Sequence, residues 1–181
     1  MKLLFGLVLF LLSGCVDTSY SYYPDPKSHY ANEIRNSVAV QLRDKMQLYP
    51  IGTGGGCMYN IRMLALSCEY YKEIDIEEAR ALLMQAALLF LKEANENEKA
   101  RPYLANYPFG INNIELRFFI RNETGPESAL DKLGLISLVD GILEYEIYPD
   151  RKDLITIYEE TFAEAAAKLN ITLTPETGLE L

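Results

Sequence analysis

The chain has 181 residues, 49% hydrophobic residues and a formal net charge of −9, which are ordinary values for a folded protein of about one domain. The acidic balance argues against binding to nucleic acid and against electrostatic attachment to anionic lipid.

The first fifteen residues have the order of an export signal. Met1-Lys2 is followed by an apolar run from Leu3 to Leu12 and then by Ser13-Gly14-Cys15. The run has about half of the roughly 20 apolar residues that a membrane span needs. Its terminal position, the basic residue before it and the small residues after it distinguish it from a core helix. We predict a signal peptide over residues 1–14 that is removed on export.

The end of this segment, Leu12-Ser13-Gly14-Cys15, resembles the lipobox of bacterial lipoproteins. The resemblance implies that the Cys15 thiol receives a diacylglycerol and that its freed amine receives a further acyl chain. Several acyl chains anchor a protein stably because each buried methylene contributes about 0.8 kcal/mol. In Gram-negative lipoproteins an aspartate directly after the cysteine favours the inner membrane, and Val16 stands here. The resemblance therefore favours the periplasmic face of the outer membrane.

Residues 15–27 are expected to form a lipidated, flexible tether, because they lack apolar periodicity and because Pro24 and Pro26 argue against a helix. A single α+β domain is expected over residues 28–170. It begins with a helix from Ser28 to Leu48, since apolar residues recur there at four-residue steps. These residues are Tyr30, Ile34, Val38, Leu42 and Met46.

Tyr49-Pro50 is expected to end the first helix, and the glycine-rich run from Gly52 to Gly56 to form a mobile link. The run lacks the Lys-Ser/Thr pair of a phosphate-binding loop. Residues 57–71 alternate loosely, which predicts one long strand covered in part on both faces, with a helix as the alternative.

Two cysteines lie on this predicted strand, and export delivers the chain to an oxidising compartment. Cys57 and Cys68 are an odd number of positions apart, so they would point to opposite faces, with Cα atoms about 35 Å apart. A disulfide allows roughly 4.4–6.8 Å. We predict that Cys57 and Cys68 are not bridged to each other.

The middle of the chain carries a helix signal and then a strand signal. Asp75-Ile76-Glu77-Glu78 fits a capping box and predicts a helix that continues to about Asn97. The strict alternation of apolar and other residues from Ile114 to Arg121 predicts a strand.

Asp140-Gly141 predicts a two-residue type I′ hairpin turn. The register would pair Leu138 with Leu143 and Ile136 with Tyr145, so that one face of the hairpin is apolar and the other polar. A final helix is expected from Leu154 to Leu169, with Asn170 as a left-handed cap and a loose tail over residues 171–181.

The predicted element order is helix, strand, helix, strand, strand, strand, helix. An α+β fold follows, with an antiparallel sheet of about four strands and helices packed on one face.

Few residues suggest catalysis. His29 is the only histidine, which excludes Ser-His-Asp, Cys-His and two-histidine zinc sites, and no metal or cofactor is expected. Paired carboxylates could cleave a glycan, but the helix start and the polar face of the hairpin already explain most of the acids. The acids considered are Glu69, Glu73, Glu77, Glu78, Glu144 and Glu146.

The connector after the second helix contains two aromatic-proline units beside an arginine. Its candidate partner-binding residues are Arg101, Tyr103, Tyr107 and Phe109, because rigid aromatic and arginine side chains are enriched in binding hot spots. In the alternative interpretation these aromatics close the end of the core.

We therefore predict a membrane-anchored envelope lipoprotein that binds another envelope protein as a non-catalytic accessory component. The alternative is a periplasmic carrier or sensor of a small apolar ligand, held between helices and sheet. Its cavity would lie on the side of Met63, Phe90, Phe118 and Tyr145. A hydrolase that acts on a glycan is a weaker alternative.

Overall fold

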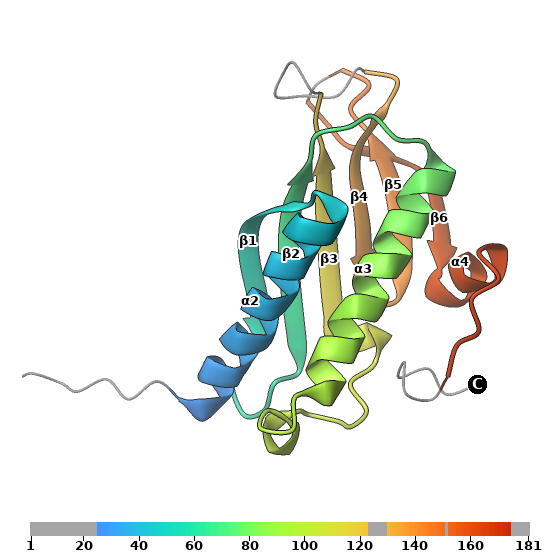
Figure 1. The fold of residues 1–181 in the computed structure, drawn as a ribbon. Coiled ribbons are helices and arrows are strands. Elements are labelled where there is room, and N and C mark those ends of the chain that lie inside the picture. The colour runs from blue at the N-terminus through green and yellow to red at the C-terminus, as the bar shows by residue number, and fades with distance from the viewer. Residues whose placement is uncertain (1–24, 123–129, 151, 175–181) are drawn as a thin grey trace, which may run out of the picture.

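A computed structural model describes residues 25–122, 130–150 and 152–174. The predicted signal peptide, Cys15, most of the predicted tether and residues 175–181 lie outside the described residues. The described part contains three α-helices and one six-stranded sheet (Figure 1). The elements are α2 (Pro26–Met46), β1 (Tyr49–Gly56), β2 (Met63–Tyr70), α3 (Ile76–Glu96), β3 (Ile114–Ile120), β4 (Leu133–Val139), β5 (Ile142–Ile147), β6 (Ile155–Thr161) and α4 (Phe162–Lys168), with short 3-10 turns η2 (Arg101–Tyr103) and η3 (Ile111–Asn113).

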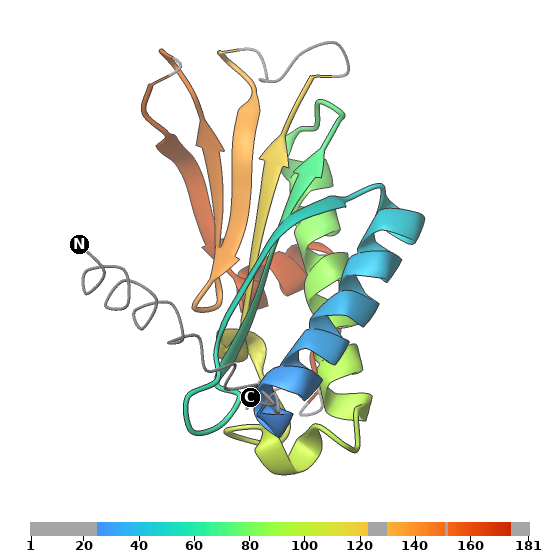
Figure 2. The same cartoon turned by 90° about the vertical axis from the view of Figure 1, so that its left-hand side faces the viewer.

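The strands follow one another across the sheet in chain order, from β1 to β6. Only the pair β2 and β3, which α3 connects, is parallel among these neighbours. The helices lie on one face of the sheet, α2 and α3 side by side and α4 next to α3 (Figure 2). The predicted α+β class is confirmed. The prediction of about four strands and the predicted order are wrong, because the sequence pattern predicts a loop where β1 lies and a helix where β6 lies.

The core fills the space between the helices and the sheet. In α2 the buried side chains are spaced by three or four residues, as the sequence predicts. In β3 burial alternates strictly, so every second side chain points toward the helices. The buried residues of these two elements are Ala31, Ile34, Val38, Leu42, Ile114, Leu116, Phe118 and Ile120.

The first helix starts earlier than expected. Pro26 is its first residue, and the Asp25 side chain accepts a hydrogen bond from the Lys27 amide (3.2 Å). A proline at this position loses nothing, because the first amides of a helix have no partner within it. The expectation that Pro26 excludes a helix is wrong, and α2 takes in the last two residues of the predicted tether.

The glycine-rich run is strand β1 and not a mobile link. The bare backbone lets α2 come close, since the Arg35 guanidinium donates to the carbonyl oxygen of Gly54 (2.5 Å). A Cβ atom on Gly55 would lie 2.7 Å from both the Arg35 Nη1 atom and the carbonyl oxygen of Met63. Pro50 is tolerated because β1 is an edge strand.

The predicted strand over residues 57–71 is too long. β2 begins at Met63, and residues 57–62 form the loop that joins it to β1. Cys57 lies in this loop and Cys68 faces the core near the end of β2. Both thiols are free, which confirms the prediction of no disulfide between them, and burial raises the pKa of Cys68 to about 12.

Two predictions from local sequence signals are confirmed. The Asp75 carboxylate accepts from the Glu78 amide (2.8 Å), and the Asp75 amide donates to the Glu78 carboxylate (3.1 Å), which completes the capping box of α3. The hairpin of β4 and β5 has the expected register, and Asp140 and Gly141 have φ values of 49° and 77°.

The prediction of a helix from residue 154 is wrong in its first half, which is strand β6. The alternation of side chains along β6 is interrupted, because the register with β5 shifts between Tyr145 and Glu146 and leaves Ile157 without an opposite residue. The sequence of β6 therefore lacks a regular strand pattern. The helix α4 starts only after Thr161, which forms a capping box with Glu164. Asn170 has the expected positive φ, 54°.

The part of the predicted tail that the structure describes is not separate from the domain. Ile171 and Leu173 are partly buried against the core, and the Ile171 amide donates to the carbonyl oxygen of Ala166 (2.9 Å).

We predict that Gly55→Ala lowers the free energy of unfolding by about 1–3 kcal/mol, because the added methyl group would overlap a backbone oxygen that cannot move aside. Urea denaturation monitored by circular dichroism measures the change. Gly52→Ala is the matched control, since its Cβ atom would lie at an ordinary 3.7 Å from Ser67 Cβ. Equal midpoints for the two variants would contradict the proposed close approach.

Candidate functional site

The structure brings two of the four predicted binding residues together on the surface. Arg101 lies in η2, directly after α3, and Tyr107 lies in the segment that follows. The Arg101 guanidinium carbon is 4.6 Å from the centroid of the Tyr107 ring, a cation–π contact. The Tyr107 residue is 55% exposed. The pair therefore presents a flat aromatic and a fixed positive charge to solvent.

The other two predicted residues serve the domain itself. Tyr103 is half-buried and stacks on Tyr30 of α2, with ring centroids 5.4 Å apart. Phe109 is fully buried. The Phe109 amide donates to the side-chain oxygen of Asn95 (2.6 Å), and the side-chain nitrogen of Asn95 donates to the carbonyl oxygen of Phe109 (3.0 Å). Phe109 and Tyr103 thus match the alternative interpretation, in which aromatics close the end of the core.

Arg101 and Tyr107 border a hollow of about 520 Å³ along the last turns of α3, which we call the α3 groove. Half-buried Leu88 supplies its apolar surface, with buried Leu91 beneath it. Lys92 and Arg101 supply positive charge, and two glutamates supply negative charge. The full lining is Leu88, Leu91, Lys92, Asn95, Glu96, Glu98, Arg101, Tyr107 and Thr174.

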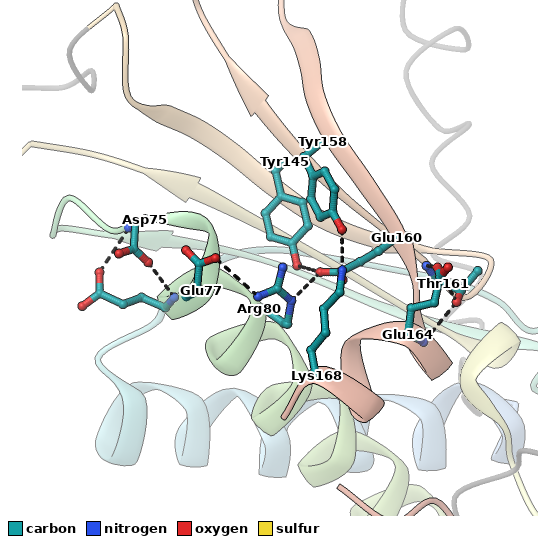
Figure 3. Close-up of polar contacts among 10 residues, drawn as sticks. Asp75, Glu77, Arg80, Tyr145, Tyr158, Glu160, Thr161, Glu164 and Lys168 are labelled. Atoms are coloured by element: carbon teal, nitrogen blue, oxygen red, sulfur yellow. Dashed lines mark hydrogen bonds and ion pairs between the residues drawn. The ribbon is translucent and has the colours of Figure 1, made fainter. Parts of the chain in front are cut away.

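The sequence analysis missed a buried ionic network around Glu160 of β6 (Figure 3). The Glu160 side chain is 1% exposed. One of its oxygens accepts from Arg80 Nε of α3 (2.6 Å) and from the Tyr145 hydroxyl of β5 (2.6 Å). The other oxygen accepts from Lys168 Nζ of α4 (2.6 Å), which also contacts the Tyr158 hydroxyl. Four elements of the fold meet at this one carboxylate.

The network keeps Glu160 ionised. Burial by itself would raise the pKa of Glu160, but the hydrogen bonds from Lys168, Tyr145 and Arg80 together lower it below its ordinary value. Burial, and then the hydrogen bond to Glu160, raises the pKa of Tyr145. Because donors occupy both carboxylate oxygens and Glu160 stays charged, it is poorly suited to proton transfer. The network is a structural clamp.

One sequence signal pointed to the clamp. Thr161-Phe162-Ala163-Glu164 fits a capping box, so the helix begins at Phe162 and the residues before it are free to form a strand. In that strand Glu160 stands opposite Leu143 and faces inward with Tyr145.

Three of the carboxylates considered for glycan cleavage, Glu73, Glu77 and Glu78, line one open hollow of about 450 Å³ at the start of α3, and the other three lie elsewhere. Glu77 and Glu78 lie in the first turn of α3, and Glu69 of β2 pairs with Arg121 (3.2 Å). Glu144 and Glu146 lie on the face of the sheet opposite the helices, where burial, and then the charge of Glu144, raises the pKa of Glu146. Neither lines the α3 groove.

The residues proposed to surround an apolar ligand do not share one cavity. Phe90, Phe118 and Tyr145 are fully buried members of the core cluster. Met63 is half-buried and precedes inward-facing Leu64 in β2, so it lies on the other face of the sheet. A filled core at these three aromatics weighs against a ligand between helices and sheet.

His29 lies exposed in the first turn of α2, 3.7 Å from the Glu33 carboxylate. Across the described residues no group of three or more His, Cys, Asp or Glu side chains is arranged to hold a metal ion. In this same part of the chain, every helix is too short or too polar to cross a membrane.

Comparison of the chain with protein-family models, with curated proteins and with solved structures finds no match in any of the three.

We predict that Glu160→Gln lowers the free energy of unfolding at pH 7 by about 3–5 kcal/mol, because it leaves buried Arg80 with only the exposed Glu77 carboxylate, 4.0 Å away, as a counter-charge. Chemical denaturation measures the loss. Glu159→Gln, at the exposed neighbouring position, is the control and should change stability by less than about 0.5 kcal/mol.

The stability of the Glu160→Gln protein should depend less on pH than the stability of the wild-type protein. The folded-state pKa of Glu160 is lower than its ordinary value of 4.5. Ionised Glu160 therefore contributes fully to stability above pH 4.5, and this contribution is lost as the pH falls through the folded-state pKa. Wild-type protein should therefore lose more stability between pH 7 and pH 3 than Glu160→Gln. Parallel curves for both proteins would show that Glu160 is not held ionised by the fold.

Proposed function

We propose that this chain is an exported lipoprotein, anchored through acylated Cys15 at the periplasmic face of the outer membrane. There it acts as a non-catalytic component that binds another envelope protein in the α3 groove. The observation that carries the proposal is the exposed Tyr107 ring, held by Arg101 beside a hollow lined by both apolar and charged side chains.

The chemistry of the α3 groove suits a protein segment. A tyrosine that an arginine already holds in place loses little conformational freedom on binding, which is why such residues contribute strongly to interfaces. Leu88 offers apolar surface for one inserted side chain, with buried Leu91 beneath it. Lys92 and Arg101 favour a carboxylate next to it, and the charges at the edge of the groove set the orientation.

The distribution of polar groups favours binding over catalysis. The deepest acid of the described core, Glu160, has both oxygens occupied by donors. The pair Glu144 and Glu146 is the best remaining support for a glycan hydrolase, since one carboxylate with a raised pKa beside another is the arrangement such enzymes use. That pair lies on the sheet face opposite the described helices and not in the α3 groove.

We expect Cys15→Ser to abolish acylation and to release the protein from the membrane fraction, because the acyl chains supply the membrane affinity. Membrane fractionation, with mass spectrometry of the mature N-terminus, tests this. Wild-type chain should begin at Cys15 and carry the mass of its acyl groups. A mature chain that still begins at Met1, or a Cys15→Ser protein that remains with membranes at wild-type levels, would refute the anchor.

We expect a photo-crosslinking amino acid at position 107 to capture one envelope protein in living cells, since Tyr107 is exposed beside the groove. The same amino acid at Tyr71, which is 42% exposed at the far end of β2, is the matched control. Arg101→Ala should reduce the captured product several-fold without changing the free energy of unfolding by more than about 0.5 kcal/mol. Equal capture at both positions would contradict a role for the groove.

A further inference from the structure

One end of the domain is tied to the predicted anchor by a short piece of chain. The described residues begin at Asp25, immediately before α2, and Cys15 precedes Asp25 by ten residues. A fully extended chain of this length spans at most about 35 Å. If Cys15 is acylated, as proposed above, the start of α2 stays within that distance of the lipid headgroups.

The loop between β1 and β2, residues 57–62, lies at this same end of the domain, next to the first turn of α2 in both views (Figures 1 and 2). Lys27 Nζ of α2 donates to the carbonyl oxygen of Met58 (3.2 Å). The Ile61 amide donates to the carbonyl oxygen of Tyr103 (2.8 Å), and the Tyr103 ring stacks on Tyr30 of α2. These contacts hold the loop in a fixed place beside the point where the tether leaves.

The tip of the loop presents two neighbouring large side chains to solvent. Met58 is 80% exposed and Tyr59 is 81% exposed, and no other large hydrophobic residue of the described part is as exposed. A single exposed apolar side chain needs no explanation. Here two stand together at the tethered end, and one is tyrosine, a residue enriched where protein meets the membrane–water interface.

We propose that Met58 and Tyr59 insert into the headgroup region of the bilayer that holds the Cys15 anchor, and thereby fix how the domain stands on the membrane. The lipid surface we propose is zwitterionic, because the net charge of −9 on the full chain disfavours anionic lipid. The acyl chains supply the affinity, and the loop supplies the orientation. This inference rests on the lipid anchor proposed above.

The sequence contains no tryptophan, so one substitution introduces a unique fluorescent reporter. Lipidated Tyr59→Trp protein in phosphatidylcholine vesicles should show a blue-shifted emission. Lipid brominated on its acyl chains should lower its intensity by about twofold or more, as expected for a ring at the boundary between headgroups and acyl chains. Lipidated Tyr71→Trp protein, with the reporter at the far end of β2, should show neither effect.

Met58→Ser in the Tyr59→Trp protein should reduce the quenching, because the neighbouring apolar side chain no longer enters the bilayer. Flotation of the same vesicles separates the two proposals. If the protein does not float, the anchor and the inference both fail. If it floats but Tyr59→Trp is quenched no more than Tyr71→Trp, only the inference fails. A blue shift that appears only when envelope proteins are added would assign the loop to a protein partner and overturn membrane insertion.

Discussion

The ionised carboxylate of Glu160 joins the C-terminal part of the fold to the rest. A buried charge is stable only when enough donors surround it, and here α3, β5 and α4 each provide one. The clamp fixes the short α4 and the edge strand β6, which offers few buried apolar side chains of its own. It also positions α3, whose last turns carry the α3 groove. The same helix thus carries the clamp near its start and the proposed binding surface near its end.

The two proposed contact surfaces lie toward one end of the molecule. α3 runs from its capping box to η2, and the Tyr30–Tyr103 stack joins η2 to α2 near the start of the described chain. The loop with Met58 and Tyr59 is tied to the same two elements. A domain oriented by this loop would hold the α3 groove close to the membrane surface. The proposed partner would then bind the α3 groove through a segment that lies outside the bilayer but close to the headgroups.

Local signals predicted part of the proposed binding surface, whereas the only local signal near the clamp is the capping box that begins at Thr161. Arg101 and Tyr107 stood out because arginine and aromatics beside proline are unusual in a connector, and the fold pairs them. Phe109 carried the same signal, yet it is buried, because only packing decides whether an aromatic side chain points inward. Glu160 gave no signal. Its neighbour Glu159 is exposed, and two adjacent acids in a predicted amphipathic helix look like solvent-facing residues.

The sequence by itself determined the features that depend on neighbouring residues: the capping box at Asp75, the turn at Asp140-Gly141 with its register, and the alternation of β3. Tertiary structure decided the features that depend on contacts between residues far apart in the sequence. Glycine-rich β1 is a strand because β2 pairs with it and Arg35 lies close to its backbone. β6 is a strand because β5 offers an edge, although its apolar spacing suits a helix equally well. Backbone pairing and the burial of a charge are long-range interactions, and a local pattern of residue types does not encode which partner will supply them.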